Sequence, residues 1–201
     1  MGTTRQAILD AAVRHLERSS PASLKIAKVA EQSRVGPPTI YHYFESRSRL
    51  IAEAQLQRAI VMIDENFELM KQLDEAIDRN DEAAIAAVVE ALSSAVWLPN
   101  QRDHIWTYID ILTALRSEPE VYERFQEVFA TDFENRVIIT KKLQAAGWMD
   151  ADIDARAWVL FFQGAAFGNV LGDLAPGVAP NFASTQKVFT TVLGAARRVA
   201  V

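Results

Sequence analysis

The chain has 201 residues, half of them hydrophobic, with a net charge of −5 and no cysteine. This length allows one small and one medium-sized domain, each with a buried core. The lack of cysteine excludes a disulfide framework and zinc–thiolate sites. No apolar signal segment follows the polar residues 1–10, and the most apolar stretch, residues 155–172, contains Arg156, Gln163 and Asn169. The sequence therefore predicts neither a secretion signal nor a membrane span, and we expect a cytoplasmic protein.

Charge is distributed unevenly along the chain. Residues 1–50 contain eight Lys or Arg and four Asp or Glu, a net charge of +4, whereas residues 51–201 contain thirteen and twenty-two, a net charge of −9. A positive segment attracts phosphate, so this asymmetry favours nucleic-acid binding by the N-terminal part. Charge alone is a weak indication, because a short segment often reaches such a value by chance.

Helical patterns recur along the chain, whereas hairpin turns and sustained alternation of polar and apolar residues are missing. The predicted fold class is therefore all-α. The first helix begins at a capping box of Thr3 and Gln6, in which each side chain satisfies the other residue's backbone N–H, and it ends at Leu16. Its apolar face consists of Ile8, Leu9, Ala12, Val13 and Leu16.

Two short helices follow, over residues 25–32 and 38–44, with a tight turn at residues 33–36 between them. Pro37 and Pro38 suit the first turn of the later helix, where backbone N–H groups have no partner. Three short helices with such a turn make a helix-turn-helix, whose third helix enters the major groove of DNA. The apolar residues expected to face inward there are Val35, Ile40 and Phe44.

Further helices are expected behind this module. Ser46 can cap a long one that reaches about Leu73, and a second capping box, Ser117 with Glu120, begins another that ends at Gly147. The remaining helices are expected near residues 81–97, 102–116, 152–174 and 182–198.

The segment from Val29 to Leu50, VAEQSRVGPPTIYHYFESRSRL, resembles the helix-turn-helix of the tetracycline-repressor (TetR) family of one-component transcriptional regulators. That family's pattern is approximately IAxxAGVSxGTLYx(H/Y)FxSKxxL, and TIYHYF followed by SR, one residue later, carries the likeness. The resemblance implies an all-α fold of about nine helices, with a DNA-binding domain at residues 1–48 and a ligand-sensing and dimerisation domain at residues 49–201. It also implies a homodimeric repressor that a small, largely apolar or aromatic effector releases from a palindromic double-stranded DNA operator.

Position by position, the resemblance assigns DNA contacts to the second and third helices and to the start of the fourth. These residues are Lys25, Ala27, Pro37, Pro38, Thr39, Tyr41, His42, Tyr43 and Arg47. Arg47 stands where the family has a lysine that contacts a backbone phosphate, and Ala27 can offer at most a contact with a thymine methyl group. Lys25 stands where a Thr or Ser often caps the second helix, and Ser23 is expected to supply that cap instead.

Three residues depart from the family pattern. Arg34 replaces a turn glycine, so that a positive φ at this position would strain the chain. Gly36 replaces a serine and weakens the N-cap of the third helix, and Pro38 replaces a common glycine. These departures leave the operator sequence open. Alternatives also stay open for Tyr41, which fits the core of the module, and for His42, which fits a solvated helix face.

Aromatic side chains are frequent on the helices behind the helix-turn-helix. The resemblance implies a ligand pocket between the middle helices, and polar residues on apolar helices are candidates because burial demands a hydrogen-bond partner. The candidate pocket residues are Trp97, His104, Trp106, Asp110, Phe129, Phe133, Trp158, Phe162, Gln163 and Phe167. Aromatic stripes at helical spacing are equally typical of a filled core, and the polar residues fit structural hydrogen bonds or plain exposure.

Glycines recur at four-residue spacing on the predicted helix 152–174. Each costs about 1 kcal/mol in a helix interior, which favours a packing reason for their presence. The resemblance implies that this helix and the last one pair with their symmetry mates, with contacts at Gly164, Gly168, Gly172, Phe189, Val192 and Leu193. Close packing within one chain is the alternative.

The sequence does not predict an enzyme, and it predicts no cofactor. The three histidines are scattered, and no nucleophile-elbow, metalloprotease or phosphate-loop motif occurs. Asp150, Asp152 and Asp154 open a predicted helix, where carboxylates stabilise the helix dipole; a metal site is the alternative. A helical adaptor that keeps the fold without binding DNA is the remaining alternative function.

Overall fold

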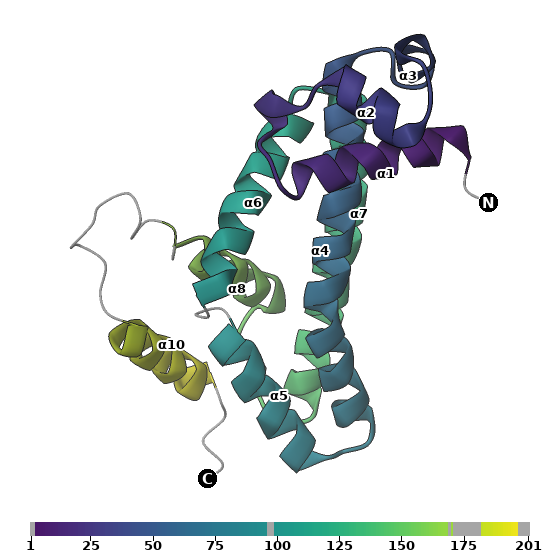
Figure 1. The fold of residues 1–201 in the computed structure, drawn as a ribbon. Coiled ribbons are helices and arrows are strands. Elements are labelled where there is room, and N and C mark those ends of the chain that lie inside the picture. The colour runs from purple at the N-terminus through teal and green to yellow at the C-terminus, as the bar shows by residue number, and fades with distance from the viewer. Residues whose placement is uncertain (1–2, 96–98, 169, 171–181, 197–201) are drawn as a thin grey trace. The chain divides into compact units, whose positions relative to one another are not determined.

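The computed structural model describes residues 3–95, 99–168, 170 and 182–196. Every regular element within these residues is helical, so the predicted all-α class is confirmed (Figure 1). The elements are α1 (Thr4–Leu16), the 3-10 helix η1 (Pro21–Ser23), α2 (Ile26–Ser33), α3 (Pro37–Phe44), α4 (Arg47–Asp78), α5 (Glu82–Ala95), α6 (Pro99–Leu115), α7 (Pro119–Ala145), α8 (Ala155–Gly168) and α10 (Phe182–Ala196).

The chain divides into two compact units. Unit 1 comprises Met1–Asp64 and Tyr108–Phe129, and unit 2 comprises Glu65–Thr107 and Ala130–Val201. Helices α4, α6 and α7 therefore contribute residues to both units. This division reflects packing, and the functional boundary predicted after residue 48 stays a prediction.

Helix α1 begins with half of the predicted capping box. The Thr3 hydroxyl accepts a hydrogen bond from the backbone N–H of Gln6 at 3.3 Å. The Gln6 side chain does not return to Thr3, because its amide donates to Asp10 at 2.7 Å and to Gln57 of α4 at 3.4 Å. The second half of the box is thus replaced by a contact between two helices.

The turn between α2 and α3 shows the strain that the sequence predicts. Arg34 has φ 57° and ψ 41°, the left-handed conformation that suits glycine best. The N-cap of α2 is Lys25, whose side chain makes no capping hydrogen bond. The prediction that Ser23 supplies this cap is wrong, because its hydroxyl donates to the carbonyl of Ser20 at 2.7 Å.

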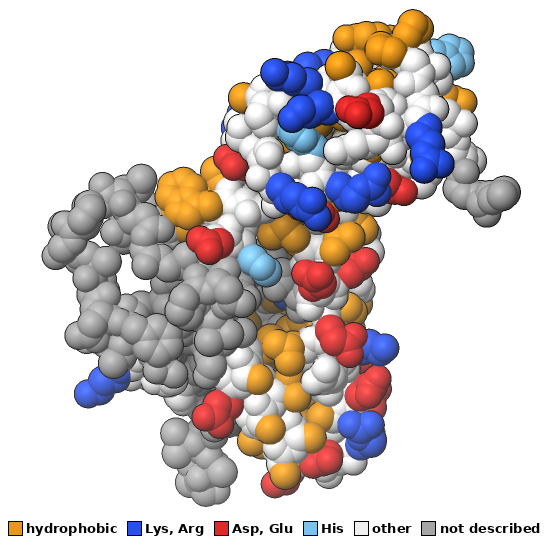
Figure 2. Space-filling view, viewed as in Figure 1, with side chains coloured by type: hydrophobic (Ala, Val, Ile, Leu, Met, Phe, Trp, Pro, Cys, Tyr) orange, Lys and Arg blue, Asp and Glu red, His pale blue; other side chains and the backbone are white. Residues whose placement is uncertain are grey.

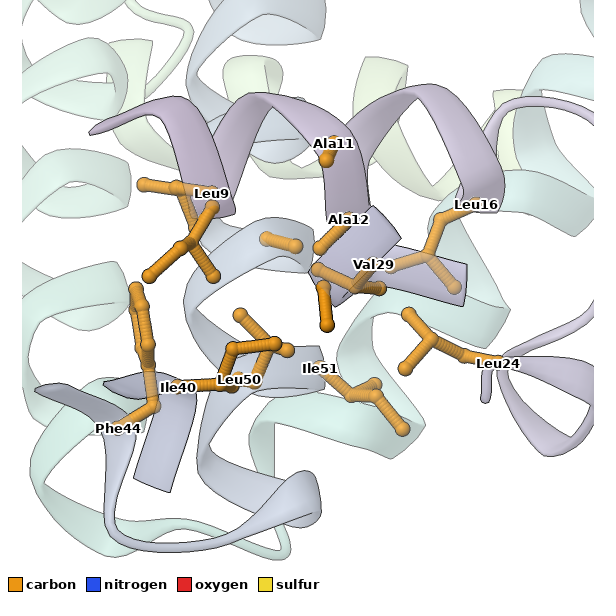
Figure 3. Close-up of a cluster of buried hydrophobic side chains, with 13 residues drawn as sticks. Leu9, Ala11, Ala12, Leu16, Leu24, Val29, Ile40, Phe44, Leu50 and Ile51 are labelled. Carbon is orange, nitrogen blue, oxygen red and sulfur yellow. The ribbon is translucent and has the colours of Figure 1, made fainter. Parts of the chain in front are cut away.

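The core of unit 1 joins the helix-turn-helix to the start of α4 (Figure 3). Ile8, Ile40 and Leu50 are fully buried, and Phe44 is 1% exposed. Burying such side chains stabilises a fold by roughly 1.5–3 kcal/mol each relative to leaving them exposed. The predicted inward positions Ile40 and Phe44 are confirmed, and Val35 packs against the same cluster while remaining half-buried.

Helix α4 begins as predicted and ends later than predicted. The Ser46 hydroxyl accepts from the backbone N–H of Arg49 at 2.9 Å. The helix continues to Asp78 because Leu73 and Ala76 are buried in a unit 2 cluster with Ile85 of α5. In unit 1, the α4 residues Ala52, Leu56 and Ala59 share a second cluster with Ile111, Leu115, Val121 and Phe125.

Two helices of unit 2, α5 and α8, have an aspartate as N-cap. Asp81 accepts from the backbone N–H of Ala84 at 3.0 Å before α5, and Asp154 accepts from the backbone N–H of Ala157 at 2.7 Å before α8.

The capping box predicted for Ser117 and Glu120, at the start of α7, is wrong. The Ser117 hydroxyl instead donates to the carbonyl of Ala114 at 2.7 Å, and the Glu120 carboxylate pairs with Arg49. Ser117 and Glu120 both belong to unit 1.

Candidate nucleic-acid interface

Helix α3 turns most of its side chains to solvent. Tyr41 is 47% exposed and Tyr43 41%, so Tyr41 lies outside the core of the module. His42 is also exposed, and its ring meets the Tyr43 ring edge-on at a centroid distance of 5.3 Å. Figure 2 shows hydrophobic side chains and a histidine gathered over this helix. The remaining predicted contacts here are Pro37 and Pro38, which are exposed, and Thr39, which is half-buried.

This surface is held from beneath by a small number of contacts. Ile40 and Phe44 anchor α3 in the core, and the guanidinium of Arg5 lies 4.8 Å from the centroid of the Phe44 ring. Gly36 is the N-cap and makes no side-chain capping bond, as the sequence predicts. Pro37 at the first helical position sets φ for the helix without losing a hydrogen bond. The exposed residues of α3 therefore sit on a rigid support.

Exposed residues of α2 and of the turn after it, several of them cations, accompany α3. Lys25 and Ala27, two of the predicted contacts, are exposed at the start of α2. Lys28 and Arg34 are exposed as well, and sequence reasoning missed them. The signal for Lys28 was its place three residues after Lys25, on the same side of a helix. Figure 2 shows Lys and Arg side chains concentrated over this part of unit 1.

Arg47 has internal partners. Its Nε donates to the carbonyl of Leu24 at 2.8 Å, and one Nη donates to the carbonyls of Pro21 and Ala22 at 2.7 and 2.9 Å. The side chain thereby ties η1 to the start of α4 and is half-buried. Hydrogen bonds from a charged donor are stronger than neutral ones, so this contact fixes the approach to α2. The phosphate contact that the resemblance implies for Arg47 stays a prediction.

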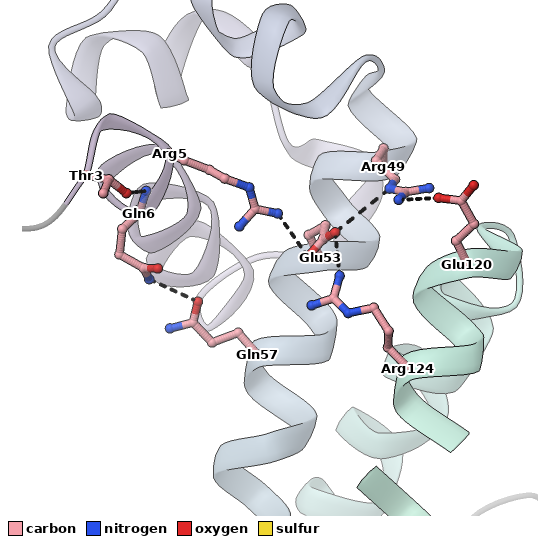
Figure 4. A network of polar contacts seen from close by, with 8 residues as sticks. All are labelled: Thr3, Arg5, Gln6, Arg49, Glu53, Gln57, Glu120 and Arg124. Carbon is pink, nitrogen blue, oxygen red and sulfur yellow. Dashed lines mark hydrogen bonds and ion pairs between the residues drawn. The ribbon is translucent and has the colours of Figure 1, made fainter. Parts of the chain in front are cut away.

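A buried carboxylate joins three helices of unit 1 (Figure 4). Glu53 of α4 is 5% exposed. One of its oxygens lies 2.8 Å from Arg124 of α7 and 3.9 Å from Arg49 of α4, and the other lies 3.3 Å from Arg5 of α1. We call these four residues the Glu53 cluster. Its signal in the sequence was a charged residue within the apolar stretch from Leu50 to Leu56.

Arg49 extends the Glu53 cluster to the start of α7. Its Nη2 donates to Glu120 at 2.6 Å. This hydrogen bond raises the pKa of the Arg49 guanidinium, and the nearby carboxylates of Glu53 and Glu45 act in the same direction against the effect of burial. Arg49 therefore remains charged, and its charge is directed towards carboxylates of its own chain.

A second polar group lies further along α4 in unit 1. Gln55 is fully buried; its amide oxygen accepts from Arg58 at 2.8 Å, while its Nε2 has no hydrogen-bond partner in the part of the chain that the structure describes. Burial lowers the pKa of Arg58, whereas the carboxylates of Glu17 and Asp110 act to raise it. Asp110, a candidate pocket residue, is exposed on α6 and acts electrostatically on Arg58.

The other candidate pocket residues are distributed over several environments. Phe129 packs against the second cluster of unit 1, beside Phe125. In unit 2, Phe133 packs against Val137 and Ala155, and Trp158 lies 4.8 Å from Phe162 between ring centroids. Three candidates are exposed, namely His104, Trp106 and Phe167, and Gln163 is half-buried. Trp97 lies outside the described residues. Which of them contact a ligand stays a prediction.

The predicted dimer residues lie on α8 and α10. Gly164 and Gly168 of α8 are exposed, and a Cβ built on either would meet no described atom within 4 Å. Phe189, Val192 and Leu193 lie on α10, and Gly172 lies outside the described residues. Exposed apolar side chains accompany the glycines of α8, with Leu160 64% and Phe161 49% exposed.

Two possible alternatives find no support within the described residues. No group of three or more His, Asp or Glu side chains there is placed to hold a metal ion. Among the same residues, no helix combines the length and the hydropathy that a membrane span requires.

Similarity to solved structures covers almost the whole chain. A protein from Saccharomonospora viridis described as a transcriptional regulator, solved in complex with choline, is 17% identical, with 94% of this chain and 95% of that one covered at a TM-score of 0.64. The TetR transcriptional regulator SCO0520 from Streptomyces coelicolor is 21% identical, with 98% and 99% covered at a TM-score of 0.53. The transcriptional regulator FadR from Bacillus subtilis, in complex with stearoyl-CoA, is 18% identical, with 94% and 96% covered at a TM-score of 0.57. No curated protein sequence matches the chain.

Helices α1, α2 and α3 lie over a common core and form a helix-turn-helix, which further helices follow. Residues 8–54 match the family described as bacterial regulatory proteins, tetR family. This match covers the helix-turn-helix and the start of α4, so these residues are similar to the N-terminal segment of that family. This family consists of transcriptional regulators, which are generally not enzymes.

Proposed function

We propose that the chain represses transcription as a homodimer, and that a small, largely apolar or aromatic molecule releases it from a palindromic operator. The observation that carries the proposal is the solvent-exposed surface of α3 above a buried core. Tyr, His and Thr side chains can contact bases and phosphates, and a rigid support keeps them in register with the groove. We assign Tyr43 and Tyr41 to DNA contacts and Lys25 and Lys28 to the neighbouring phosphates.

The surroundings of Arg47 favour a positioning role for this residue. Three backbone carbonyls already accept from its Nε and Nη2. Moving the guanidinium to a phosphate would break these bonds and leave the carbonyls to water. We therefore propose that Arg47 orients α2 and the turn to α3, and that Lys28 carries charge to the DNA backbone.

Support for a homodimer comes from α8. Its exposed Leu160 and Phe161 lie on the same helix as Gly164 and Gly168, where an added Cβ would meet no described atom within 4 Å. This favours the dimer over the alternative in which the glycines allow close packing within the chain. Exposed apolar patches mark interaction sites, and a two-fold axis would present two α3 helices to successive grooves.

Support for a small-molecule effector comes from proteins of similar fold. One of them binds choline and another binds stearoyl-CoA, so this architecture accommodates small molecules of different chemistry. An effector must bind the DNA-free arrangement more tightly than the DNA-bound one. The Glu53 cluster offers a route for the coupling, since a shift of Arg124 on α7 acts through Glu53 on Arg5 of α1.

DNA binding is tested by fluorescence anisotropy with labelled DNA from upstream of the chain's own gene, at several salt concentrations. We expect Tyr43→Ala to weaken operator binding about tenfold or more. Tyr43→Phe, which keeps the ring, should weaken it less, and Lys71→Ala, at an exposed lysine of unit 2, should leave it unchanged. Absence of salt-sensitive binding to any palindromic site, upstream or elsewhere in the genome, would contradict the proposal.

The salt dependence of the affinity for DNA distinguishes the phosphate contact proposed for Lys28 from the positioning role proposed for Arg47. Lys28→Ala should reduce the slope of log K against log salt by about 0.9, the value for one lost phosphate contact. Arg47→Ala should weaken binding by misplacing α2 and should leave that slope unchanged. A reduced slope for Arg47→Ala would return Arg47 to the phosphate contact that the family resemblance implies.

A further inference from the structure

Unit 2 contains a buried carboxylate whose hydrogen-bonding capacity is only half used. Asp132 of α7 is 6% exposed, and its Oδ2 accepts from Nε of Arg136, one turn later, at 2.8 Å. Its Oδ1 is buried and has no hydrogen-bond partner among the described residues. Buried polar atoms without a partner are rare in folded proteins, and each one calls for an explanation. Oδ1 therefore has the capacity to accept a hydrogen bond from a bound molecule.

Asp132 belongs to the interior stripe of α7. Residues four and seven positions apart lie on one side of a helix, so Asp132, Arg136 and Ile139 share a face. Ile139 is 4% exposed and packs in a cluster with Leu73 of α4 and Ile85 of α5. The ion pair thus lies beside buried apolar side chains, and an apolar environment with a single polar pair suits a ligand with an apolar body and one polar group.

We propose that Oδ1 of Asp132 accepts a hydrogen bond from the hydroxyl group of a small apolar ligand, an alcohol or a phenol. Arg136 already balances the charge of the carboxylate, so a cationic ligand would add an uncompensated charge to the interior. A neutral hydroxyl adds none, and its oxygen can accept in turn from the remaining N–H groups of Arg136. The inference rests on the proposed function, whose effector it names by chemical class.

Because Oδ1 is buried, such a ligand would bind two arrangements of the protein with different affinity, as an effector must. Because the oxygen is closed off from solvent, a ligand reaches it only when the helices of unit 2 part locally. The ligand then binds one arrangement of the protein and not the other. This difference in affinity is the condition for a ligand to shift a conformational equilibrium.

The experiment uses two probes that differ in one hydrogen-bond donor. Para-ethylphenol and its methyl ether, para-ethylanisole, are titrated into the full-length protein by isothermal calorimetry. We expect the phenol to bind about tenfold more tightly, because only the phenol can donate to the carboxylate. In Asp132→Asn an amide N–H replaces the free acceptor and donates to either probe, so the ratio of affinities should fall to about one.

Two further variants control this result. Glu134→Gln removes an exposed carboxylate of the same helix and should preserve the tenfold ratio. The double variant Asp132→Leu/Arg136→Met replaces the pair by apolar side chains of similar size, a change that folded proteins tolerate. It should also bring the ratio to about one, and it provides the measurement if Asp132→Asn does not fold.

Several outcomes would overturn the inference. These are equal binding of both probes by the unmodified protein, no binding of either, tighter binding of para-ethylbenzylammonium than of the phenol, or a ratio that survives the loss of Asp132. Operator release is measured in parallel. Phenol binding with the expected ratio but without operator release contradicts only the proposed function, whereas release by both probes alike contradicts only the assignment of Asp132.

Discussion

Two carboxylates, one in each compact unit, are equally buried but unequally partnered. Glu53 in unit 1 is 5% exposed and is surrounded by Arg5, Arg49 and Arg124 from three helices. Asp132 in unit 2 is 6% exposed, and among the described residues its ionic partner is Arg136 of its own helix. Because burying a charge is costly unless it is paired and hydrogen-bonded, the two sites serve different ends. Glu53 holds a helix junction together, whereas Asp132 keeps an acceptor available inside the fold.

The largest loss of stability is expected when the carboxylate of Glu53 is removed from the Glu53 cluster. Glu53→Leu should lower the free energy of unfolding by about 3 kcal/mol, the low end for a broken buried pair, because Arg5 and Arg124 can turn to solvent. Three like charges would then remain at one junction. Urea denaturation followed by circular dichroism measures the change. A loss smaller than about 1 kcal/mol would mean that Glu53 contributes no more to stability than an exposed ion pair does. Glu53 and Asp132 would then not differ in the way described above.

A smaller loss is expected at the other carboxylate. Asp132→Leu should lower the free energy of unfolding by about 2 kcal/mol, because one largely buried cation, Arg136, loses the carboxylate that it pairs with. The same urea titration provides the comparison with Glu53→Leu. An equal or larger loss than that of Glu53→Leu would mean that Asp132 has a purely structural role, like Glu53.

Removing the whole pair in unit 2 sharpens the comparison further. Asp132→Leu/Arg136→Met should change the free energy of unfolding by less than about 1 kcal/mol, or raise it, because no charge is left in the interior. Thermal unfolding of this variant beside the single variant checks the expectation. If the double variant is less stable than Asp132→Leu, the pair contributes to stability as a unit and is not kept for binding.

The smallest effect is expected at the edge of the Glu53 cluster. Glu120 is 76% exposed in its pair with Arg49, and exposed ion pairs contribute little because water and salt screen them. Glu120→Gln should therefore lower the free energy of unfolding by less than about 0.5 kcal/mol. Measurement at low and high salt should show that this small difference vanishes at high salt, while the loss in Glu53→Leu persists.

Local sequence signals predicted the framework of the DNA-binding module. The inward positions Ile8, Ile40 and Phe44 are buried, Ser46 caps α4, and Arg34, which stands at the family's turn glycine, has a positive φ. These features depend on residues within one or two helical turns of one another. Helix periodicity and capping chemistry therefore suffice to find them.

Predictions that depended on the partner of a polar side chain were less successful. Ser23 and Ser117 were expected to cap helices, but each donates to a carbonyl three residues earlier. Serine hydroxyls form such local bonds as readily as caps, so the sequence leaves the choice open. The carbonyls that accept from Arg47 lie 23 to 26 residues away, a separation over which no local pattern carries information, and its phosphate contact stays a prediction.

The sequence by itself determined that the described part of the chain is helical, where its helix-turn-helix lies, and that Tyr41, His42 and Tyr43 of α3 are candidates for contact with DNA. Only the tertiary structure decided the use of the charged residues inside it. Glu53 pairs with Arg124, which is 71 residues away, and one oxygen of Asp132 accepts no hydrogen bond from the described residues. The physical reason is that periodicity reveals which side chains are buried, whereas their partners come from distant segments that only packing brings together.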